Sequence, residues 1–210
     1  MLAIAGGKGG SGKTTTALGV AGALAQRRRR PLVVDCDLDA PNLHIRAGVD
    51  RDPGVGALAG DADGPDLETT AREVTALPGV DVLPAGDADG SDLAAALDRL
   101  PSDRPVLLDC PAGASEAAAR PLRAADATVL VATLGRESVE DAVKTAAMAR
   151  AVGTPPCVAA VSREPSVPDG FRAALGAPDA VAVPDVPAPL TADAATAAYA
   201  RLAECGAPNA

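Results

Sequence analysis

Short apolar runs alternate with longer segments of helical character along most of the chain. Five mostly apolar runs predict buried strands, at residues 1–5, 31–35, 80–84, 105–109 and 127–132. Helices are predicted at residues 14–26, 65–77, 93–100 and 191–205. We expect Asp92 to cap the third of these helices. The alternation, in a chain of 210 residues, predicts a single α/β domain over residues 1–210.

A glycine-rich segment joins the first strand to the first helix and reads G-x-x-x-x-G-K-T. Glycines let backbone N–H groups turn toward phosphate oxygens, and the helix N-terminus that follows favours the same anion. Lys13 can reach the β- and γ-phosphates, and the Thr14 hydroxyl can bind Mg²⁺. The pattern predicts an ATP and Mg²⁺ site at Gly7, Lys8, Gly9, Gly10, Ser11, Gly12, Lys13, Thr14 and Thr15.

Acidic residues follow two of the predicted strands. Asp35 and Asp37 come at the end of the second, and Asp109 ends the run at 105–109, four residues before Gly113. Ligands of open α/β sheets lie at the carboxyl ends of strands, so these carboxylates should face the phosphates. They would repel a triphosphate unless a cation lay between them, which predicts Mg²⁺ held by Thr14, Asp37 and Asp109. The Gly113 amide is expected to contact the γ-phosphate.

Lys8 is not required by an ordinary phosphate loop. The segment Gly7-Lys-Gly-Gly-Ser-Gly-Lys-Thr14 resembles the deviant Walker A motif of the MinD/ParA family of ATPases, and Asp109-Cys-Pro-Ala-Gly113 resembles the switch II segment of MinD. The resemblance implies a P-loop fold whose mostly parallel sheet carries helices on both faces. It also implies an ATP-sandwich homodimer, in which Lys8 reaches the nucleotide of the partner subunit.

The same resemblance implies roles for the other site residues. Asp37 would position or activate the attacking water and Asp35 would support the outer shell of the metal, although the resemblance leaves open which residue does which. Lys8, Lys13 and Asp109 complete the catalytic set. Family members have a serine-capped helix where Ser138 stands here, followed by a strand like residues 157–161. Where many of them then hold adenine with Asn-Arg, this chain has Ser-Arg163, so Arg163 is the candidate adenine contact.

Composition narrows the possible partners. The chain has a net charge of −9 and 1% aromatic residues, so it offers neither a basic surface for phosphate backbones nor rings for base stacking. The one basic run, residues 27–30, falls where the first helix ends and cations complement the helix dipole. Arg201 is the only cation of the last predicted helix, which is therefore unlike a basic membrane-binding helix. We expect binding to neither nucleic acid nor membrane.

Lysine and cysteine usage bear on the environment. Only three lysines occur, and Asp far exceeds Glu, which is typical of a high-salt cytoplasm or of a GC-rich genome; we favour the first. Four cysteines form no C-x-x-C pair and no secretory leader is recognisable, which predicts a reducing cytoplasm with each cysteine a small buried hydrophobe. Cys36 and Cys110 follow candidate site acids, so a redox or metal role for them stays open.

Three functions fit these residues. The first is a slow ATPase that works as a dimerisation switch and positions a cytoplasmic division, motility or chemosensory assembly through a protein partner that the sequence does not identify. The second is a metallochaperone or iron–sulfur accessory ATPase, and the third is a silent nucleotide-binding scaffold. Metal retention that depends on cysteine would favour the second, and absence of turnover would favour the third.

Overall fold

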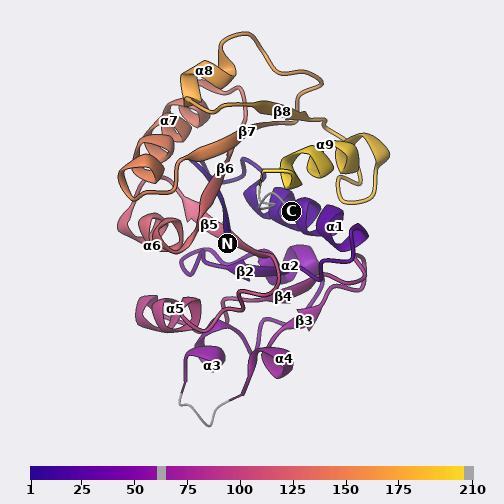
Figure 1. Ribbon diagram of the computed structural model, residues 1–210, viewed down its shortest axis with the longest axis vertical. Coiled ribbons are helices and arrows are strands. Elements are labelled where there is room, and N and C mark those ends of the chain that lie inside the picture. Colours follow the sequence, from indigo (N-terminus) through magenta and orange to yellow (C-terminus); the bar gives the residue numbers. More distant parts are fainter. Residues whose placement is uncertain (61–64, 206–210) are drawn as a thin grey trace.

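The computed structural model describes residues 1–60 and 65–205, in which eight strands form one sheet in the order β3-β4-β2-β5-β1-β6-β7-β8 (Figure 1). Every neighbouring pair is parallel except β3 with β4, which is antiparallel. The strands are β1 (Leu2–Gly6), β2 (Leu32–Asp35), β3 (Arg72–Glu73), β4 (Asp81–Leu83), β5 (Val106–Ala112), β6 (Ala127–Ala132), β7 (Pro156–Ser162) and β8 (Ala180–Val183).

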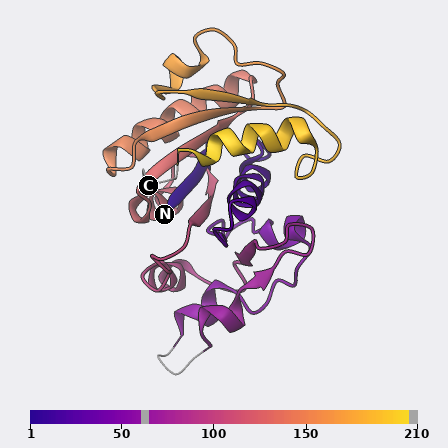
Figure 2. The ribbon, with the colours of Figure 1, turned by 45° about the vertical axis from the view of Figure 1, so that its right-hand side comes forward.

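Helices cover both faces of the sheet. On one face α9 lies beside α1, with α2 near the other end of the sheet, and on the opposite face lie α5, α6 and α7 (Figures 1 and 2). The helices are α1 (Lys13–Gln26), α2 (Leu43–Ala47), α3 (Val55–Ala59), α4 (Leu67–Thr70), α5 (Gly90–Leu97), α6 (Glu116–Ala124), α7 (Arg136–Ala151), α8 (Phe171–Leu175) and α9 (Asp193–Ala203). This arrangement confirms the predicted α/β class with a mostly parallel sheet.

Side chains of the central strand alternate between two hydrophobic cores. Leu2 and Ile4 of β1 face the core that contains α1 and α9, whereas Ala3 and Ala5 face the core that contains α5. Large rings are nearly absent, so the layers approach closely through small residues. A Cβ added at Gly19 of α1 would lie 2.2 Å from Cδ2 of the Tyr199 ring on α9. The position of α9 therefore depends on a glycine in α1.

Two predicted helix starts are wrong. Asp92 was expected to cap the helix at 93–100, but α5 begins at Gly90, where Asp89 caps it and Asp92 completes a capping box. Ser138 was expected to cap the next helix, but α7 begins at Arg136, and the Ser138 hydroxyl accepts a hydrogen bond from the Thr133 amide at 3.0 Å. The cap of α5 is therefore Asp89, three residues before the predicted one, whereas α7 has Gly135 at its N-cap, without a side-chain cap, and Ser138 lies inside the helix.

The segment predicted as a helix at residues 65–77 is mostly not helical. It forms only the short α4, followed by the edge strand β3. The Asp66 carboxylate accepts from the Thr69 amide and caps α4, while β3 pairs with β4. Pairing with the sheet edge, a contact distant from the local sequence, therefore overrides the helical pattern after Thr70.

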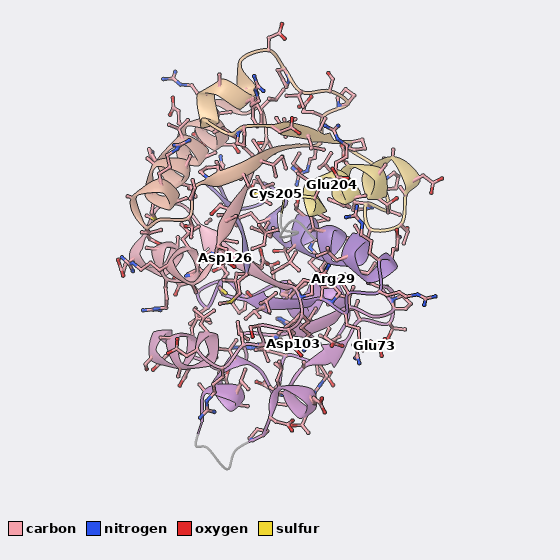
Figure 3. All side chains as sticks on the ribbon, viewed as in Figure 1. Arg29, Glu73, Asp103, Asp126, Glu204 and Cys205 are labelled. Carbon is pink, nitrogen blue, oxygen red and sulfur yellow. A yellow bond between two sulfur atoms is a disulfide. The ribbon has the colours of Figure 1, made fainter. Side chains whose placement is uncertain are left out.

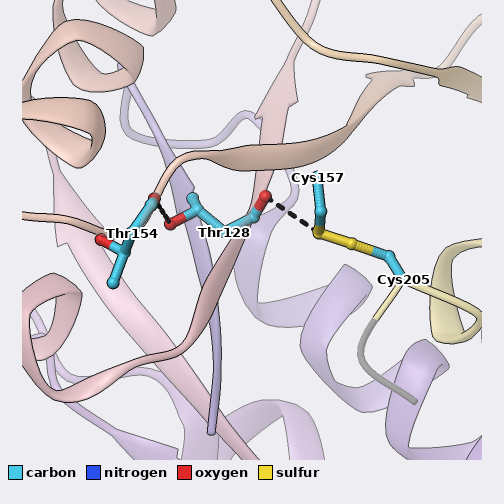
Figure 4. The surroundings of a disulfide bond; sticks show 4 residues. All are labelled: Thr128, Thr154, Cys157 and Cys205. Carbon is cyan, nitrogen blue, oxygen red and sulfur yellow. Dashed lines mark hydrogen bonds between the residues drawn. A yellow bond between two sulfur atoms is a disulfide. The ribbon is translucent and has the colours of Figure 1, made fainter. Parts of the chain in front are cut away.

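The cysteine prediction is half right. Cys36 and Cys110 are free and buried, and burial raises the pKa of both thiols, so they behave as small hydrophobes. Cys157 and Cys205, in contrast, form a disulfide across 48 residues (Figure 4). The cysteine pattern consequently gives no support for a reducing compartment. In the two described stretches of the chain, no helix is both long enough and apolar enough to cross a membrane.

Candidate functional site

Three neighbouring strands bring the predicted site residues to one edge of the sheet. β1 leads into the glycine loop and is flanked by β5, which in turn is flanked by β2. Asp109 of β5 is in register with Ile4 of β1 and with Asp35 of β2. The two acids and the loop therefore meet at the carboxyl edge, as the sequence predicts.

The glycines of the loop differ in what they do. A Cβ at Gly7 would lie 2.1 Å from Cβ of Asp141 on α7, so Gly7 allows the loop to pass against that helix. Gly10 and Gly12 have φ of 78° and 99°, and a Cβ at Gly12 would lie 2.9 Å from the Ser162 hydroxyl. Gly9 has no atom within 4 Å of such a Cβ. Three of the four glycines are thus required by the protein itself, by close contact or by backbone angle.

Two hydrogen bonds within the loop converge on the Lys8 carbonyl. The Lys8 carbonyl accepts from the Ser11 amide at 3.4 Å and from Nζ of Lys13 at 3.4 Å. Lys13 is 7% exposed, and its hydrogen bond to the Lys8 carbonyl keeps its ammonium group at the loop. Gly12 caps α1 without a side-chain oxygen, so the amides at this helix start, where Thr14 and Thr15 lie, remain available to an anion.

Lys8 points elsewhere than Lys13. Its ammonium group forms an ion pair with the Glu137 carboxylate at the start of α7. The side chains of Lys8 and Glu137 are 52% and 77% exposed. The hydrogen bond to Glu137 and its charge raise the pKa of Lys8, so the group stays a cation. An exposed pair of this kind contributes little to stability and can be exchanged for another anion.

Asp35 acts on the backbone of its own segment. One carboxylate oxygen accepts from the Asp37 amide and the other from the Leu43 amide, both at 3.1 Å. Burial raises the pKa of Asp35 to about 6, and these two hydrogen bonds act in the opposite direction. Asp35 therefore fixes both ends of the acidic loop that carries Asp37. Oδ1 of Asp37 accepts from the Ala40 amide at 3.2 Å.

Asp109 is the most perturbed carboxyl group of the site. It is 2% exposed, and its Oδ1 atom has no hydrogen-bond partner among the described residues. Burial raises the pKa of Asp109 to about 7; the Thr14 hydroxyl opposes this change, the charge of Asp35 adds to it, and Lys13 opposes it. A buried carboxylate oxygen without a donor is suited to bind a cation or a proton. The buried Ser11 hydroxyl is likewise without a partner.

Asparagine at position 109 should stabilise the ligand-free protein at alkaline pH. The pKa of Asp109 rises from 3.8 to about 7 on folding, so the folded protein favours the protonated carboxyl group. Well below pH 4 this group is protonated in both states and costs no stability. As the pH rises to about 7, the free energy of unfolding falls, because the unfolded state loses this proton first. We expect Asp109→Asn to exceed the wild type by about 2 kcal/mol at pH 8 and by much less at pH 4.5. Chemical denaturation in EDTA at both pH values measures this.

The exposed carboxylate Asp103 provides the matched control, since Asp103→Asn removes the same charge from the surface. A difference between wild type and Asp109→Asn that is equal at both pH values would contradict the assignment.

Two expected contacts are directed at the protein itself in this structure. The Gly113 amide, expected at the γ-phosphate, donates to the Gly6 carbonyl at 3.3 Å. The Arg163 guanidinium, the candidate adenine contact, donates to the Gly10 carbonyl at 2.8 Å. Arg163 adopts φ of 64°, uncommon for a residue with a side chain, directly after β7. The contact that Arg163 makes is therefore with the phosphate loop.

Sequence reasoning missed Glu137 and Ser162. Glu137 was assigned no role, because an acidic residue in the first turn of a helix has an ordinary explanation in the helix dipole. Ser162 marked only a departure from the family pattern, yet it limits the space at Gly12. Neither contact leaves a signal in spacing, because each joins residues more than 120 positions apart.

Comparisons with known proteins agree with this geometry. The family described as the CobQ/CobB/MinD/ParA nucleotide binding domain matches residues 2–165. An uncharacterised ATP-binding protein of Methanocaldococcus jannaschii is 33% identical over 172 residues, which cover 77% of this chain and 63% of that protein. The chain thus spans less than two thirds of the length of this curated relative.

Solved structures agree over more of the chain. The cell division ATPase MinD of Pyrococcus furiosus is 26% identical with a TM-score of 0.79, and the alignment covers 97% of this chain and 96% of that one. The septum site-determining protein MinD of Pyrococcus horikoshii, complexed with Mg-ADP, is 25% identical with a TM-score of 0.80, covering 97% and 93%.

Proposed function

Because this chain belongs to the CobQ/CobB/MinD/ParA nucleotide-binding family, we propose that it is a Mg²⁺-ATP-dependent dimerisation switch with slow ATPase activity. One observation carries the proposal: beside the phosphate loop, the buried Lys13 acts on the buried carboxyl group of Asp109, whose Oδ1 atom has no hydrogen-bond partner among the described residues. A cation and an acid so arranged suit the phosphates and the metal of the same ligand.

The residues fit a magnesium ion at this place. Asp109 offers an oxygen without a donor, the Thr14 hydroxyl interacts with that carboxyl group, and Asp37 has one carboxylate oxygen free of protein hydrogen bonds among the described residues. Oxygen ligands of this kind, completed by water and phosphate, are those that Mg²⁺ prefers. When bound, Mg²⁺ would neutralise charge that develops on the transferred phosphate.

Lys8 supports the dimer. It reaches out of the loop to an exposed acid rather than into its own phosphate site, and it can exchange Glu137 for a nucleotide phosphate of a second copy. A phosphate carries more charge and more acceptor oxygens than Glu137, so the exchange is favourable when ATP is present. Asp37 would hold the attacking water, with its position set by Asp35.

The output of the switch would pass to a protein partner in the cytoplasm. Net charge of −9 opposes nucleic acid binding. α9 offers no membrane-binding face among the described residues, because its large apolar side chains Tyr199 and Leu202 are buried in the core. The described part of the chain holds no cluster of three or more His, Cys, Asp or Glu side chains suited to a metal, so no observation favours the metal-delivery alternative.

A variant blocked in hydrolysis tests the proposal. Asp37→Ala with Mg²⁺ and ATP should give twice the 20.6 kDa mass of the chain by light scattering, and the same protein with ADP should stay at 20.6 kDa. Asp37→Asn is the second variant, since it keeps the oxygen that accepts from the Ala40 amide while losing the charge. ATP-saturated protein that remains monomeric in both variants would overturn the dimerisation switch. Wild-type ATP turnover no higher than that of Lys13→Ala would favour the third function, a silent nucleotide-binding scaffold.

A further inference from the structure

The disulfide lies at the edge of the sheet opposite the phosphate loop. Cys157 is the second residue of β7, beside Thr128 near the start of β6, and Cys205 follows the end of α9 (Figure 4). The two Cα atoms are 5.9 Å apart. The bond therefore joins the end of α9 to the amino edge of the sheet.

The four cysteines fall into two classes of accessibility. Cys36 and Cys110 are 2% and 1% exposed and lie inside the core between the sheet and α5. Cys157 and Cys205 are only partly buried, at the margin of the core that contains α1. A dissolved thiol can reach the second pair and not the first, because exchange needs direct access to sulfur.

A cavity of about 570 Å³ opens at this edge and includes Cys205 in its wall, but not Cys157. Figure 3 shows Arg29, Asp103, Asp126 and Cys205, which come from four segments of the chain, around the amino ends of the central strands. Most of the remaining wall is apolar, including Leu2, Leu24 and Leu107. The volume is sufficient for a small organic molecule. Asp126 pairs with the amino group of Met1, whereas Arg29 and Asp103 form no ion pair among the described residues, so one cation and one anion of the wall suit a zwitterionic molecule.

Cys157 has a polar partner for its reduced form. The Thr128 carbonyl oxygen lies 3.3 Å from Sγ of Cys157 (Figure 4). A free thiol at this position can donate to that carbonyl, so reduction leaves no unpartnered group on β7. Thr128 belongs to β6, and its hydroxyl donates to the Thr154 carbonyl at 2.9 Å, which fixes the position of this residue.

We propose that Cys157 and Cys205 form a thiol-exchange site, in which a zwitterionic low-molecular-weight thiol enters the cavity at the amino edge and attacks the sulfur of Cys205. Attack by the thiolate forms a mixed disulfide on Cys205 and breaks the Cys157–Cys205 bond. The leaving Cys157 thiolate takes a proton from solvent and donates to the Thr128 carbonyl. A second thiolate attacks the small-molecule sulfur of the mixed disulfide and releases Cys205. In sum, two small thiols are oxidised to one small disulfide, and the protein disulfide is reduced to two thiols.

Reduction of the disulfide should loosen the end of α9 and leave the phosphate loop unchanged. Reduction frees the end of α9, while the contact of Tyr199 with Gly19 and the hydrogen bond from Arg27 to the Ala200 carbonyl remain. We therefore expect loss of the covalent link without loss of the fold. A 48-residue separation predicts a fall in melting temperature of roughly 5 to 10 °C on reduction.

Three measurements on the full chain test the proposal. Alkylation under denaturing conditions, read by intact mass, should leave two cysteines protected without dithiothreitol and alkylate these two, Cys157 and Cys205, after dithiothreitol treatment of the folded protein. Thermal unfolding should show the expected fall, together with faster hydrogen exchange at the last turn of α9. Cys157→Ser treated with glutathione disulfide should acquire the mixed disulfide at Cys205 at least fivefold faster than Cys205→Ser acquires it at Cys157.

The Cys157→Ser/Cys205→Ser double variant is the control, because dithiothreitol should then leave its melting temperature unchanged. Alkylation of Cys157 and Cys205 in the untreated protein would overturn the bond itself. Equal rates for the two single variants would overturn the attack through the cavity. A melting temperature that does not move on reduction of the wild type would overturn the effect on α9. None of these results depends on ATP, so the proposed switch stands or falls separately.

Discussion

Lys13→Ala should weaken nucleotide binding strongly, whereas Lys8→Ala should keep the nucleotide and lose the dimer. Lys13 is 7% exposed at the loop, so its removal takes away a buried cation from the phosphates. Loss of such a partner should weaken ATP binding at least about 100-fold. Lys8 is 52% exposed and paired with Glu137, so its removal should change ATP affinity less than about threefold. Titration calorimetry with Mg-ATP measures both affinities.

Turnover and mass separate the two lysines further. Both variants should lose ATPase activity, but only Lys8→Ala should do so while saturated with ATP and monomeric by light scattering. The third lysine of the chain, Lys144, pairs with Asp141 on the surface of α7 and gives the matched control, since Lys144→Ala should behave as the wild type. ATP-dependent dimers of Lys8→Ala would contradict the role given to this residue.

Alanine at Gly19 should destabilise the protein, whereas alanine at Gly22 in the same helix should stabilise it. Both changes favour an α-helix by about 1 kcal/mol. At Gly19 the new Cβ would lie 2.2 Å from the ring of Tyr199, which is 1% exposed and has no room to move. At Gly22 the nearest atom is the end of the flexible Leu77 side chain at 3.4 Å. We expect a loss of about 3 kcal/mol for Gly19→Ala and a gain of about 0.5 kcal/mol for Gly22→Ala.

Denaturant unfolding monitored by circular dichroism measures both values. The double variant Gly19→Ala/Tyr199→Leu should lose less than the sum of its two single changes, because the smaller side chain makes room for the methyl group. Equal effects at Gly19 and Gly22 would show that the α1–α9 contact does not limit the packing of these helices.

Most of the site was predictable because its signals are local. The phosphate loop is a continuous segment, and Asp35 and Asp109 each end an apolar run, so parallel pairing must bring them to the loop. The roles of individual groups were less predictable. Nothing in the sequence indicates that Asp35 binds the Asp37 and Leu43 amides, because that choice depends on how the acidic loop turns after β2.

Long-range contacts account for the remaining differences. Strand β8 was not predicted, since its sequence, Ala-Val-Ala-Val, is short and takes its conformation from pairing with β7. The disulfide was not predicted because 48 residues separate Cys157 from Cys205, and only the packing of α9 brings them together. Edge strand β3 replaced a predicted helix for the same reason. In each case a partner distant in the sequence decides the structure.

The contact between Tyr199 and Gly19 gives this protein a built-in optical probe. The chain contains no tryptophan and a single tyrosine. When it is excited at wavelengths that the single phenylalanine hardly absorbs, its emission therefore arises from the Tyr199 ring, which packs on the helix whose first residue is Lys13. Emission spectra of the unlabelled protein will report when α9 separates from α1, without a dye that would disturb this contact.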